Sequence, residues 1–293
     1  MKGIILAGGT GSRLDPLTRV TNKHLLPVYD KPLIYYPIST LMAAGIRDIL
    51  IITRPEDSDS FRKLLGDGSR IGVQFSFRVQ DNPRGIADAL AIGKDFVGED
   101  SLCLILGDNI FHGIGFGREL SKYQSKKGAS IYAYTVSDPE RYGVVELDSL
   151  GSPISIEEKP SKPKSKYAIP GLYFFDKFVF DYLRGLTPSH RNELEITDVL
   201  ENYLSRNALD VSIMPRGTAW LDCGTTNSLH EASAYIKVLQ ERQGIKIACI
   251  EEVAWRMEFI SDEELRNLSS QNPNPDYSSY LVKILEIGND LDV

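Results

Sequence analysis

The sequence predicts an α/β fold with a mixed, mostly parallel central sheet that is flanked by helices. Strand-like and helix-like segments alternate through the first half of the chain, the middle part is rich in strand-like segments, and the last part is mostly helical. Strands that alternate with helices imply crossover connections, which produce a largely parallel sheet covered on both faces. The 293 residues, 42% of them hydrophobic, can bury a sizeable core, so a disordered or fibrous chain is excluded.

The first strand is predicted by a short apolar run that ends in glycines. Residues 4–7, Ile-Ile-Leu-Ala, are too few for a helix and are bounded by Gly8 and Gly9. Together with Gly11, these glycines let the backbone approach phosphate oxygens, because no Cβ intervenes and a positive φ costs little. Taken alone, the glycines are equally compatible with an ordinary tight turn.

Two basic residues follow this glycine-rich turn. Arg13 is suited to bidentate phosphate contacts and Lys23 to contact as a point charge. The spacing of the glycines matches neither the P-loop nor the dinucleotide-binding fingerprint. The stretch is therefore predicted to hold a nucleoside triphosphate in a different kind of loop.

The remaining elements are predicted in order along the chain. Helices are expected at 33–44, 86–96 and 116–127, and strands at 48–53, 73–79, 102–106 and 130–136. After about residue 140 come three strand-like pieces, RYGVVELD, PISIEE and GLYFFD. The last part contains a helix over 229–243 that closes at Gly244, a capping box from Ser261 to Glu264, and an apolar helix face of Tyr280, Leu281, Ile284 and Leu285.

Two aspartates each follow an apolar segment. Asp108 comes after the strand 102–106 and Gly107, and Asp222 comes after Ala219-Trp220-Leu221. In sheets of this kind the ligand crevice lies beyond the carboxyl ends of the strands, where the Gly8 turn also falls. Two carboxylates with phosphate oxygens and water would suit Mg²⁺, although either aspartate alone is more often a helix cap or turn residue.

Charge and cysteine content restrict the partners and the compartment. The formal net charge of −7 argues against a nucleic-acid-binding surface. Three widely spaced cysteines without a CxxC pair fit a reducing compartment. No apolar run is long enough to cross a membrane, so we expect a soluble cytoplasmic protein with no membrane partner.

Several motifs together resemble the sugar nucleotidyltransferases. They are LAGGTGSRL, KHLLPVYDKPLIYYPISTLMAAGI, LGDN, RYGVVE, EEKP, PKSKYAIPGLYFFD, ELEITDV and AWLDCGT, spread over nearly the whole chain. They are most similar to those of the longer glucose-1-phosphate thymidylyltransferases. The resemblance implies a Rossmann-like nucleotidyltransferase fold with a strand-rich sugar-binding subregion and a C-terminal helical extension.

The resemblance also implies a reaction. An oxygen of glucose 1-phosphate would attack the α-phosphorus of dTTP and release pyrophosphate, giving dTDP-glucose for pathways such as dTDP-rhamnose supply. Because the nucleophile is already an anion, positioning and charge stabilisation suffice. The implied catalytic residues are Arg13 on the pyrophosphate, Lys23 on the α-phosphate, Lys159 on the sugar phosphate, and Asp108 and Asp222 on Mg²⁺.

The same motifs imply a sugar pocket and a base pocket. Glu158 of EEKP would accept hydrogen bonds from sugar hydroxyls, although alone it reads as part of a solvated charge run. The other implied sugar contacts are Tyr142, Gly143, Lys159, Ile169 and Gly171. Gln80 and Gly85 match the positions that read the pyrimidine, and the remaining nucleotide contacts are Gly8, Gly9, Gly11, Arg13, Lys23, His24 and Asp108.

Four positions depart from the pattern of the thymidylyltransferases. His24 and Asp88 replace frequent glutamines, Asn192 replaces a frequent glycine, and Cys223 stands where threonine is usual. His24 could donate to a phosphate or a deoxyribose, and its protonation would then make activity depend on pH near neutrality.

The resemblance predicts the domain organisation and the assembly. Residues 1–226 would form the catalytic domain, with a nucleotide part at about 1–137 and a sugar part at about 138–226. Residues 227–293 would form a helical region that packs on this core. By the same resemblance we expect a homotetramer in which this region takes part in subunit contacts and in a regulatory nucleotide site.

Two other functions stay open at this stage. UTP or another hexose 1-phosphate could be the substrate, since thymine and uracil differ by one methyl group worth about 1 to 3 kcal/mol. A nucleotide-sugar sensor without turnover is less favoured, because the chain keeps every charged phosphate and metal residue named above.

Overall fold

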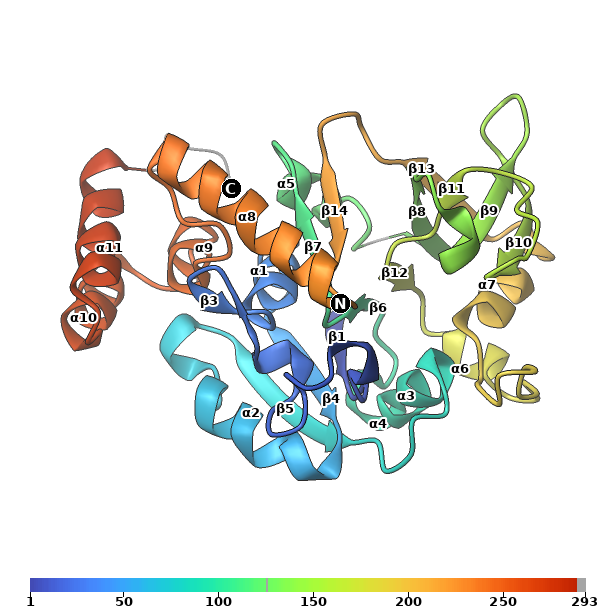
Figure 1. The fold of residues 1–293 in the computed structure, drawn as a ribbon, viewed down its shortest axis with the longest axis horizontal. Coiled ribbons are helices and arrows are strands. Elements are labelled where there is room, and N and C mark those ends of the chain that lie inside the picture. Colours follow the sequence, from blue (N-terminus) through green and yellow to red (C-terminus); the bar gives the residue numbers. More distant parts are fainter. Residues whose placement is uncertain (125, 289–293) are drawn as a thin grey trace.

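One ten-stranded sheet forms the centre of the protein. The computed structural model describes residues 1–124 and 126–288, and its sheet has the order β10-β9-β11-β8-β12-β6-β1-β4-β5, with β13 beside β8 (Figure 1). The strands are β1 Lys2–Ala7, β4 Asp48–Thr53, β5 Gln74–Val79, β6 Leu102–Leu106, β8 Ala129–Thr135, β9 Gly143–Leu147, β10 Pro153–Glu158, β11 Tyr167–Ala168, β12 Leu172–Phe175 and β13 Leu209–Ile213.

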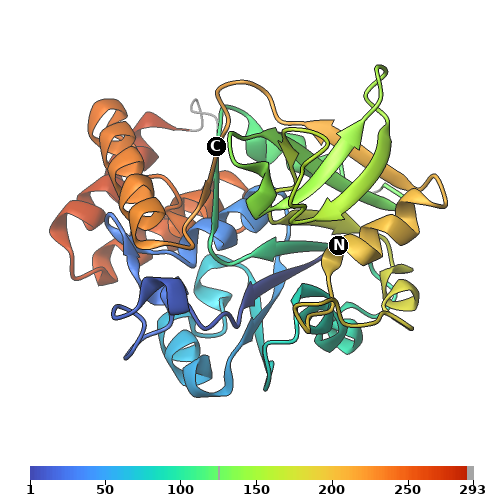
Figure 2. The ribbon, with the colours of Figure 1, turned by 45° about the vertical axis from the view of Figure 1, so that its right-hand side comes forward.

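The sheet has a parallel half and a largely antiparallel half. Strands β6, β1, β4 and β5 are parallel neighbours, whereas β12 is antiparallel to both β6 and β8. Strands β9, β10 and β11 continue in the antiparallel sense and form the strand-rich part shown in green in Figure 2. The predicted α/β fold with a mixed central sheet is confirmed, with the parallel pairing concentrated in β6-β1-β4-β5. The strand-rich pieces after residue 140 belong to the same sheet.

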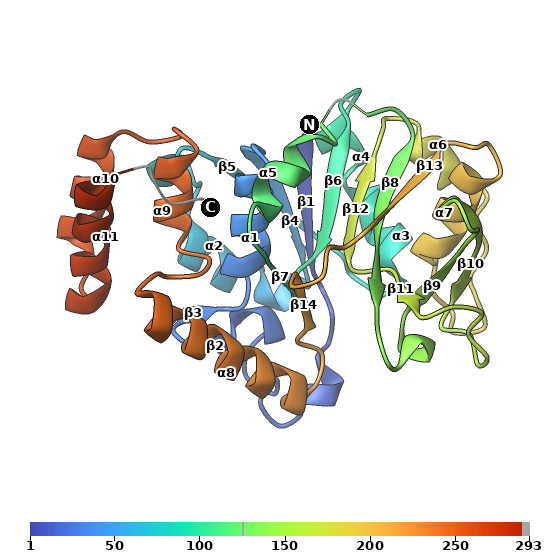
Figure 3. The same cartoon turned by 90° about the horizontal axis from the view of Figure 1, so that it is seen from above.

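Helices cover both faces of this sheet (Figure 3). They are α1 Tyr35–Ala43, α2 Ser58–Leu65, α3 Ile86–Ile92, α4 Lys94–Val97, α5 Phe116–Ser121, α6 Val179–Tyr182, α7 Ile196–Leu204, α8 Thr226–Gln243, α9 Ile250–Arg256, α10 Asp262–Gln271 and α11 Pro275–Ile287. Neighbouring residues of one strand belong to different cores: Ile5 packs with residues of α1 and α9, whereas Ile4 packs with residues of α3 and α7. Burial on both faces explains why these strands read as continuous apolar runs.

Two predicted helices differ from the observed ones. The helix expected at 86–96 divides at Gly93, where a Cβ would lie 2.5 Å from Cδ1 of Ile4, so the close approach to β1 requires glycine. The helix expected at 116–127 ends at Ser121, and residue 125 lies outside the described residues.

Three small elements border the functional region. Strands β2 Pro27–Val28 and β3 Lys31–Pro32 form a hairpin against which α8 packs. Strands β7 Asn109–His112 and β14 Ala219–Asp222 form an antiparallel pair. A short 3-10 helix at Lys23–Leu25 precedes the hairpin.

The predicted capping box at Ser261 and the closing Gly244 are confirmed, whereas α8 begins at Thr226, before the predicted start at residue 229. Thr225 and Ser261 cap α8 and α10 with capping boxes, and Gly244 ends α8 in the left-handed conformation. Tyr280, Leu281 and Ile284 are buried on α11, which packs against α10 and α9. Helices α10 and α11 lie at the end of the molecule opposite α7 in Figures 1 and 3. Among the described residues no helix is long and apolar enough to cross a membrane.

A close backbone contact joins the C-terminal part to the core at Gly72. Gly72 has φ 67° and ψ 20°, and a Cβ there would lie 2.4 Å from the carbonyl oxygen of Phe259. The Arg47 guanidinium completes the contact by donating to the Gly72 carbonyl at 2.7 Å while lying over the Phe259 ring.

We expect Gly72→Ala to destabilise the protein by at least about 2 kcal/mol, because the backbone conformation and the clash both oppose a Cβ. Gly244→Ala is the matched control, since Gly244 has φ 67° and ψ 26° but only Lys283 Nζ within 4 Å, at 3.8 Å. Its cost should be about 1 kcal/mol. Equal urea denaturation midpoints for the two variants would show that the Phe259 contact is unimportant.

Candidate active site

The carboxyl ends of β1 and β6 place two loops side by side. The strands are parallel neighbours with Leu6 opposite Leu106, so the Gly8 turn and the Gly107-Asp108 turn emerge together, as predicted. The Gly107 amide donates to the Leu6 carbonyl at 2.9 Å. A Cβ on Gly107 would lie 2.8 Å from that carbonyl oxygen, so this approach requires glycine.

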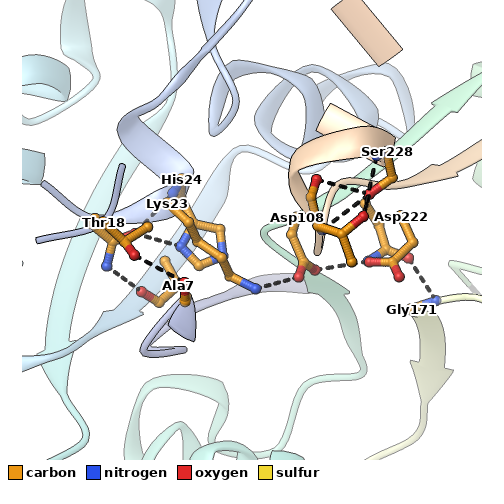
Figure 4. Close-up of polar contacts among 12 residues, drawn as sticks. Ala7, Thr18, Lys23, His24, Asp108, Gly171, Asp222 and Ser228 are labelled. Atoms are coloured by element: carbon orange, nitrogen blue, oxygen red, sulfur yellow. Dashed lines mark hydrogen bonds and ion pairs between the residues drawn. The ribbon is translucent and has the colours of Figure 1, made fainter. Parts of the chain in front are cut away.

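Lys23 and Asp108 form an ion pair where these loops meet. Figure 4 shows the Lys23 ammonium directed at the Asp108 carboxylate, which also accepts a 2.9 Å hydrogen bond from the side-chain Nδ2 of Asn109. Burial by itself raises the pKa of Asp108, but the Lys23 charge and these hydrogen bonds outweigh it and hold the pKa below its usual value. Asp108 is thus kept as a buried anion.

Asp222 reaches the same place from the other half of the chain. In the β7–β14 pair Asp222 lies opposite Asn109, and the Cys223 amide donates to the Asp108 carbonyl at 2.9 Å. Burial and the negative charge of Asp108 raise the pKa of Asp222. The guanidinium of Arg141 lies 3.7 Å from the Asp222 carboxylate.

These two carboxylates fit a divalent metal ion of the Mg²⁺ type. Both offer hard oxygen donors. Burial and, after it, repulsion by Asp108 raise the pKa of Asp222, and a bound cation would relieve both effects. Within residues 1–124 and 126–288, no group of three or more His, Cys, Asp or Glu side chains is placed to hold a metal. An ion bound here would take its remaining ligands from phosphate and water.

A cavity beside Asp108 brings together all six predicted sugar contacts. Its lining includes Tyr142, Gly143, Glu158, Lys159, Ile169 and Gly171, together with Arg13, Asp108 and Asp222. Burial raises the pKa of Glu158, and the Arg191 guanidinium lies 3.5 Å from its carboxylate. Glu158 is therefore half-buried in the structure and is not a solvated member of a charge run.

A second cavity holds most of the predicted nucleotide contacts. It is lined by Gly8, Gly9, Lys23, His24, Gln80, Gly85 and Asp108, and it shares Ile86, Leu106 and Asp108 with the first cavity. Arg13 lines the sugar-side cavity instead. Its guanidinium lies so close to Gly224 that a Cβ added to that glycine would be 2.7 Å from it. Gly11 lines neither cavity. It has a φ of 65° and Thr18 packs against it, so its role is to form the turn itself.

The predicted pH dependence of His24 is wrong. His24 is only 1% exposed, and burial together with the Lys23 charge lowers its pKa to about 3. Its backbone amide and its Nδ1 both contact Oδ1 of Asn22, at 2.9 and 2.6 Å. The imidazole is therefore neutral throughout the physiological range and cannot titrate near pH 7.

Several site residues were missed by the sequence reasoning. Asn109, part of LGDN, orders the sugar side, because its Oδ1 accepts from Trp220 Nε1 at 2.6 Å and from the Gly171 amide at 3.1 Å. Arg141 and Arg191 each approach a predicted site carboxylate. Asn109 could have been found from its motif, whereas the two arginines depend on loop positions that local sequence does not reveal.

Two of the sequence departures have a local explanation. Asn192 has φ 60°, a left-handed conformation that glycine adopts freely and asparagine tolerates. Cys223 is fully buried beside Asp222, in the core under α8. Neither departure removes a charge from the site.

Comparison with known proteins places this geometry among nucleotide-transferring enzymes. The family model described as nucleotidyl transferase matches residues 2–238. Glucose-1-phosphate thymidylyltransferases of Mycolicibacterium smegmatis and Neisseria meningitidis are each 52% identical, over 98% of this chain and 99% and 100% of theirs.

Two solved structures resemble the fold. The first, from Bacillus anthracis, is provisionally named a glucose-1-phosphate thymidylyltransferase and contains sucrose; it has a TM-score of 0.74 at 48% identity, over 80% of this chain and 94% of that one. A UDP-glucose pyrophosphorylase with UDP-glucose has a TM-score of 0.72 at 26% identity, over 81% of this chain and 98% of that one.

The buried neutral His24 should make the protein less stable in mild acid. Its pKa is about 3 when folded and near 6.5 when unfolded, so the unfolded chain binds the extra proton and stability falls as the pH drops below 6.5. Between pH 7.5 and pH 5 we expect the wild type to lose about 2 kcal/mol more than His24→Gln does. Urea denaturation of both proteins at the two pH values measures this, and parallel losses would contradict it.

Proposed function

The chain belongs to the nucleotidyl transferase family, and we propose that it transfers the thymidylyl group of dTTP to glucose 1-phosphate, with release of pyrophosphate. The family predicted from the motifs is thereby confirmed. The observation that carries the proposal is the pair of cavities that meet at Asp108, one beside the glycine turn and one beside Glu158. A nucleotide in the first and a sugar phosphate in the second would place their phosphates at the Lys23–Asp108 pair.

The reaction needs only positioning and charge. An anionic oxygen of the sugar phosphate forms a bond to the α-phosphorus while the bond to the β-phosphate oxygen breaks, and pyrophosphate leaves with that electron pair. No proton has to be removed from the nucleophile, which agrees with the neutral, fixed state of His24. Oriented charges in a partly enclosed site are the main source of rate enhancement for such transfers.

We assign each charged residue one task in this scheme. Arg13 holds the leaving pyrophosphate, Lys23 holds the α-phosphate, and Lys159 holds the incoming sugar phosphate. Asp108 and Asp222 would hold Mg²⁺, which when bound supplies neutralisation of the phosphate charge. Members of this family generally use a divalent metal, and the Asp108 and Asp222 carboxylates, which line the same cavity, support magnesium here.

We assign the remaining contacts in the same way. Glu158 would accept hydrogen bonds from the sugar hydroxyls, and the pocket around them is made by Tyr142, Gly143, Ile169 and Gly171. Gln80 and Gly85 would contact the base, with Gly8, Gly9 and His24 along the nucleotide.

UTP is the second candidate nucleotide. The fold is also similar to that of the UDP-glucose pyrophosphorylase described above, and a single methyl group separates the two bases. The 52% identity to thymidylyltransferases over nearly the whole chain favours dTTP.

We propose a catalytic domain at residues 1–226 and a C-terminal helical region from 227, of which 289–293 lie outside the described residues. A separate cavity between α1, the β7–α5 loop and the α8–α9 segment supports a regulatory nucleotide site there; its lining includes His112, Gly115, Lys246 and Glu252. Cys103, Cys223 and Cys249 are buried free thiols, which supports a cytoplasmic location.

Pyrophosphate release with glucose 1-phosphate and Mg²⁺ tests the function. We expect kcat/KM to be higher with dTTP than with UTP. We expect Asp108→Asn to lower kcat/KM at least about 100-fold, because Asp108, which is both the partner of Lys23 and a proposed metal ligand, loses its charge. Asp95→Asn changes an exposed carboxylate and should leave activity unchanged. A preference for UTP would reassign the nucleotide, and no turnover with either would refute the proposal.

Sedimentation at micromolar concentration tests the assembly. We expect a particle of four times the 32.7 kDa chain mass. A monomer under these conditions would contradict the proposed homotetramer.

A further inference from the structure

Gln80 and Asp88 form a side-chain pair at the base end of the nucleotide cavity. Gln80 follows β5, is 8% exposed and lines the cavity. Asp88 lies in the first turn of α3, one of the positions at which this chain departs from the thymidylyltransferase pattern. The two side chains are in direct contact, so the departure bears on the group that faces the base.

The contacts of Gln80 determine which end of its amide faces the cavity. Its Nε2 donates to Oδ2 of Asp88 at 2.8 Å and to the Gly85 carbonyl at 3.4 Å. A carboxylate and a carbonyl only accept hydrogen bonds, so the atom between them must be the nitrogen. The oxygen Oε1 points the other way, toward Gly8, where a Cβ would lie 3.3 Å from it. Gln80 therefore offers an acceptor beside the glycine turn.

Asp88 is itself held in place. The Arg84 guanidinium pairs with the second carboxylate oxygen, Oδ1, at 2.9 Å, and the Asp88 side chain is only 12% exposed. The backbone before α3 is fixed by Leu194, which accepts from the Ala87 amide at 3.2 Å and donates to the Arg84 carbonyl at 2.7 Å. Gly85 has φ 105° there, and a Cβ would lie 2.4 Å from the Leu194 carbonyl oxygen.

We propose that Asp88 is a positioning residue that locks the Gln80 amide and so makes the site select a pyrimidine that carries a hydrogen on ring nitrogen 3. Thymine and uracil carry this N–H, and it can donate to the fixed Oε1. Cytosine has a lone pair at the same nitrogen, which would face the Gln80 oxygen without a hydrogen between them. This inference rests on the proposed nucleotide transfer and adds to it the residue that sets base class.

The lock explains why an acidic residue can replace glutamine at this position. A glutamine at 88 could present either its oxygen or its nitrogen to Gln80, because its amide can turn. An aspartate carboxylate accepts only, so one orientation of Gln80 remains. A site with a buried hydrogen-bond acceptor strongly rejects a substrate that lacks the corresponding donor. An apolar pocket discriminates much less strongly between substrates that differ by one methyl group.

Asp88→Asn tests the lock with almost no change in volume. Its amide can either accept from or donate to Gln80, so Gln80 can turn. Pyrophosphate release is measured with dTTP, UTP and dCTP. We expect the kcat/KM ratio of dTTP to dCTP to fall at least about tenfold, mainly through KM, while the ratio of dTTP to UTP stays within about twofold of wild type.

Arg84→Gln is the matched control. It removes the exposed partner of Asp88 but leaves the carboxylate bonded to Gln80, so the dTTP-to-dCTP ratio should stay within about twofold of wild type. A residue with a merely structural role would lower turnover of both nucleotides equally. An unchanged ratio in Asp88→Asn, with wild-type turnover intact, would overturn the inference.

Failure of the proposed function gives a different result. If wild type releases no pyrophosphate with any of these nucleotides, calorimetric binding of dTTP and dCTP to wild type and Asp88→Asn replaces the rate assay. Tighter dTTP than dCTP binding that converges in the variant would still support the lock, whereas equal binding of both nucleotides to wild type would overturn it. Equal denaturation midpoints of the two proteins exclude misfolding as the cause.

Discussion

The ion pair between Lys23 and Asp108 is the contact on which the active site depends. It joins the segment after β1 to the turn after β6, and burial of both partners would be unfavourable unless their geometry were fixed. Two features fix it. His24 packs against Gly107 so closely that a Cβ there would lie 2.7 Å from the imidazole Cδ2, and the hairpin that follows is held under α8. The charge at the centre of the site is thus supported from several elements.

The mixed sheet explains why the two substrates meet at this point. Its parallel half supplies the glycine turn and Asp108, as expected for loops at carboxyl strand ends. Its antiparallel half begins at β12, whose preceding residue Gly171 accepts from the Leu106 amide at 2.9 Å. A Cβ on Gly171 would lie 2.5 Å from Leu106, so only glycine allows the sugar side to come this close. The junction of the two halves is the junction of the two cavities.

The sequence predicted the parts of the site that depend on local pattern. Gly8, Gly9 and Asp108 follow apolar strands, and their meeting at one sheet edge follows from parallel pairing. The approach of Asp222 to Asp108 depends on the β7–β14 pair, which joins residues far apart in the chain. The state of His24 could not be predicted either, because its pKa is set by burial and by the neighbouring Lys23 charge. The break at Gly93 and the positions of Arg141 and Arg191 likewise result from tertiary packing.

The three buried cysteines make the chain convenient for site-specific labelling. Maleimide reagents react with thiolates, and burial raises the pKa of Cys103, Cys223 and Cys249, so all three remain protonated and shielded. Ile114, in the loop between β7 and α5, is fully exposed. A cysteine introduced there would be the one readily modified thiol in the folded protein. A fluorophore attached to it would stand beside the separate cavity between α1, the β7–α5 loop and the α8–α9 segment, without any native cysteine having to be removed.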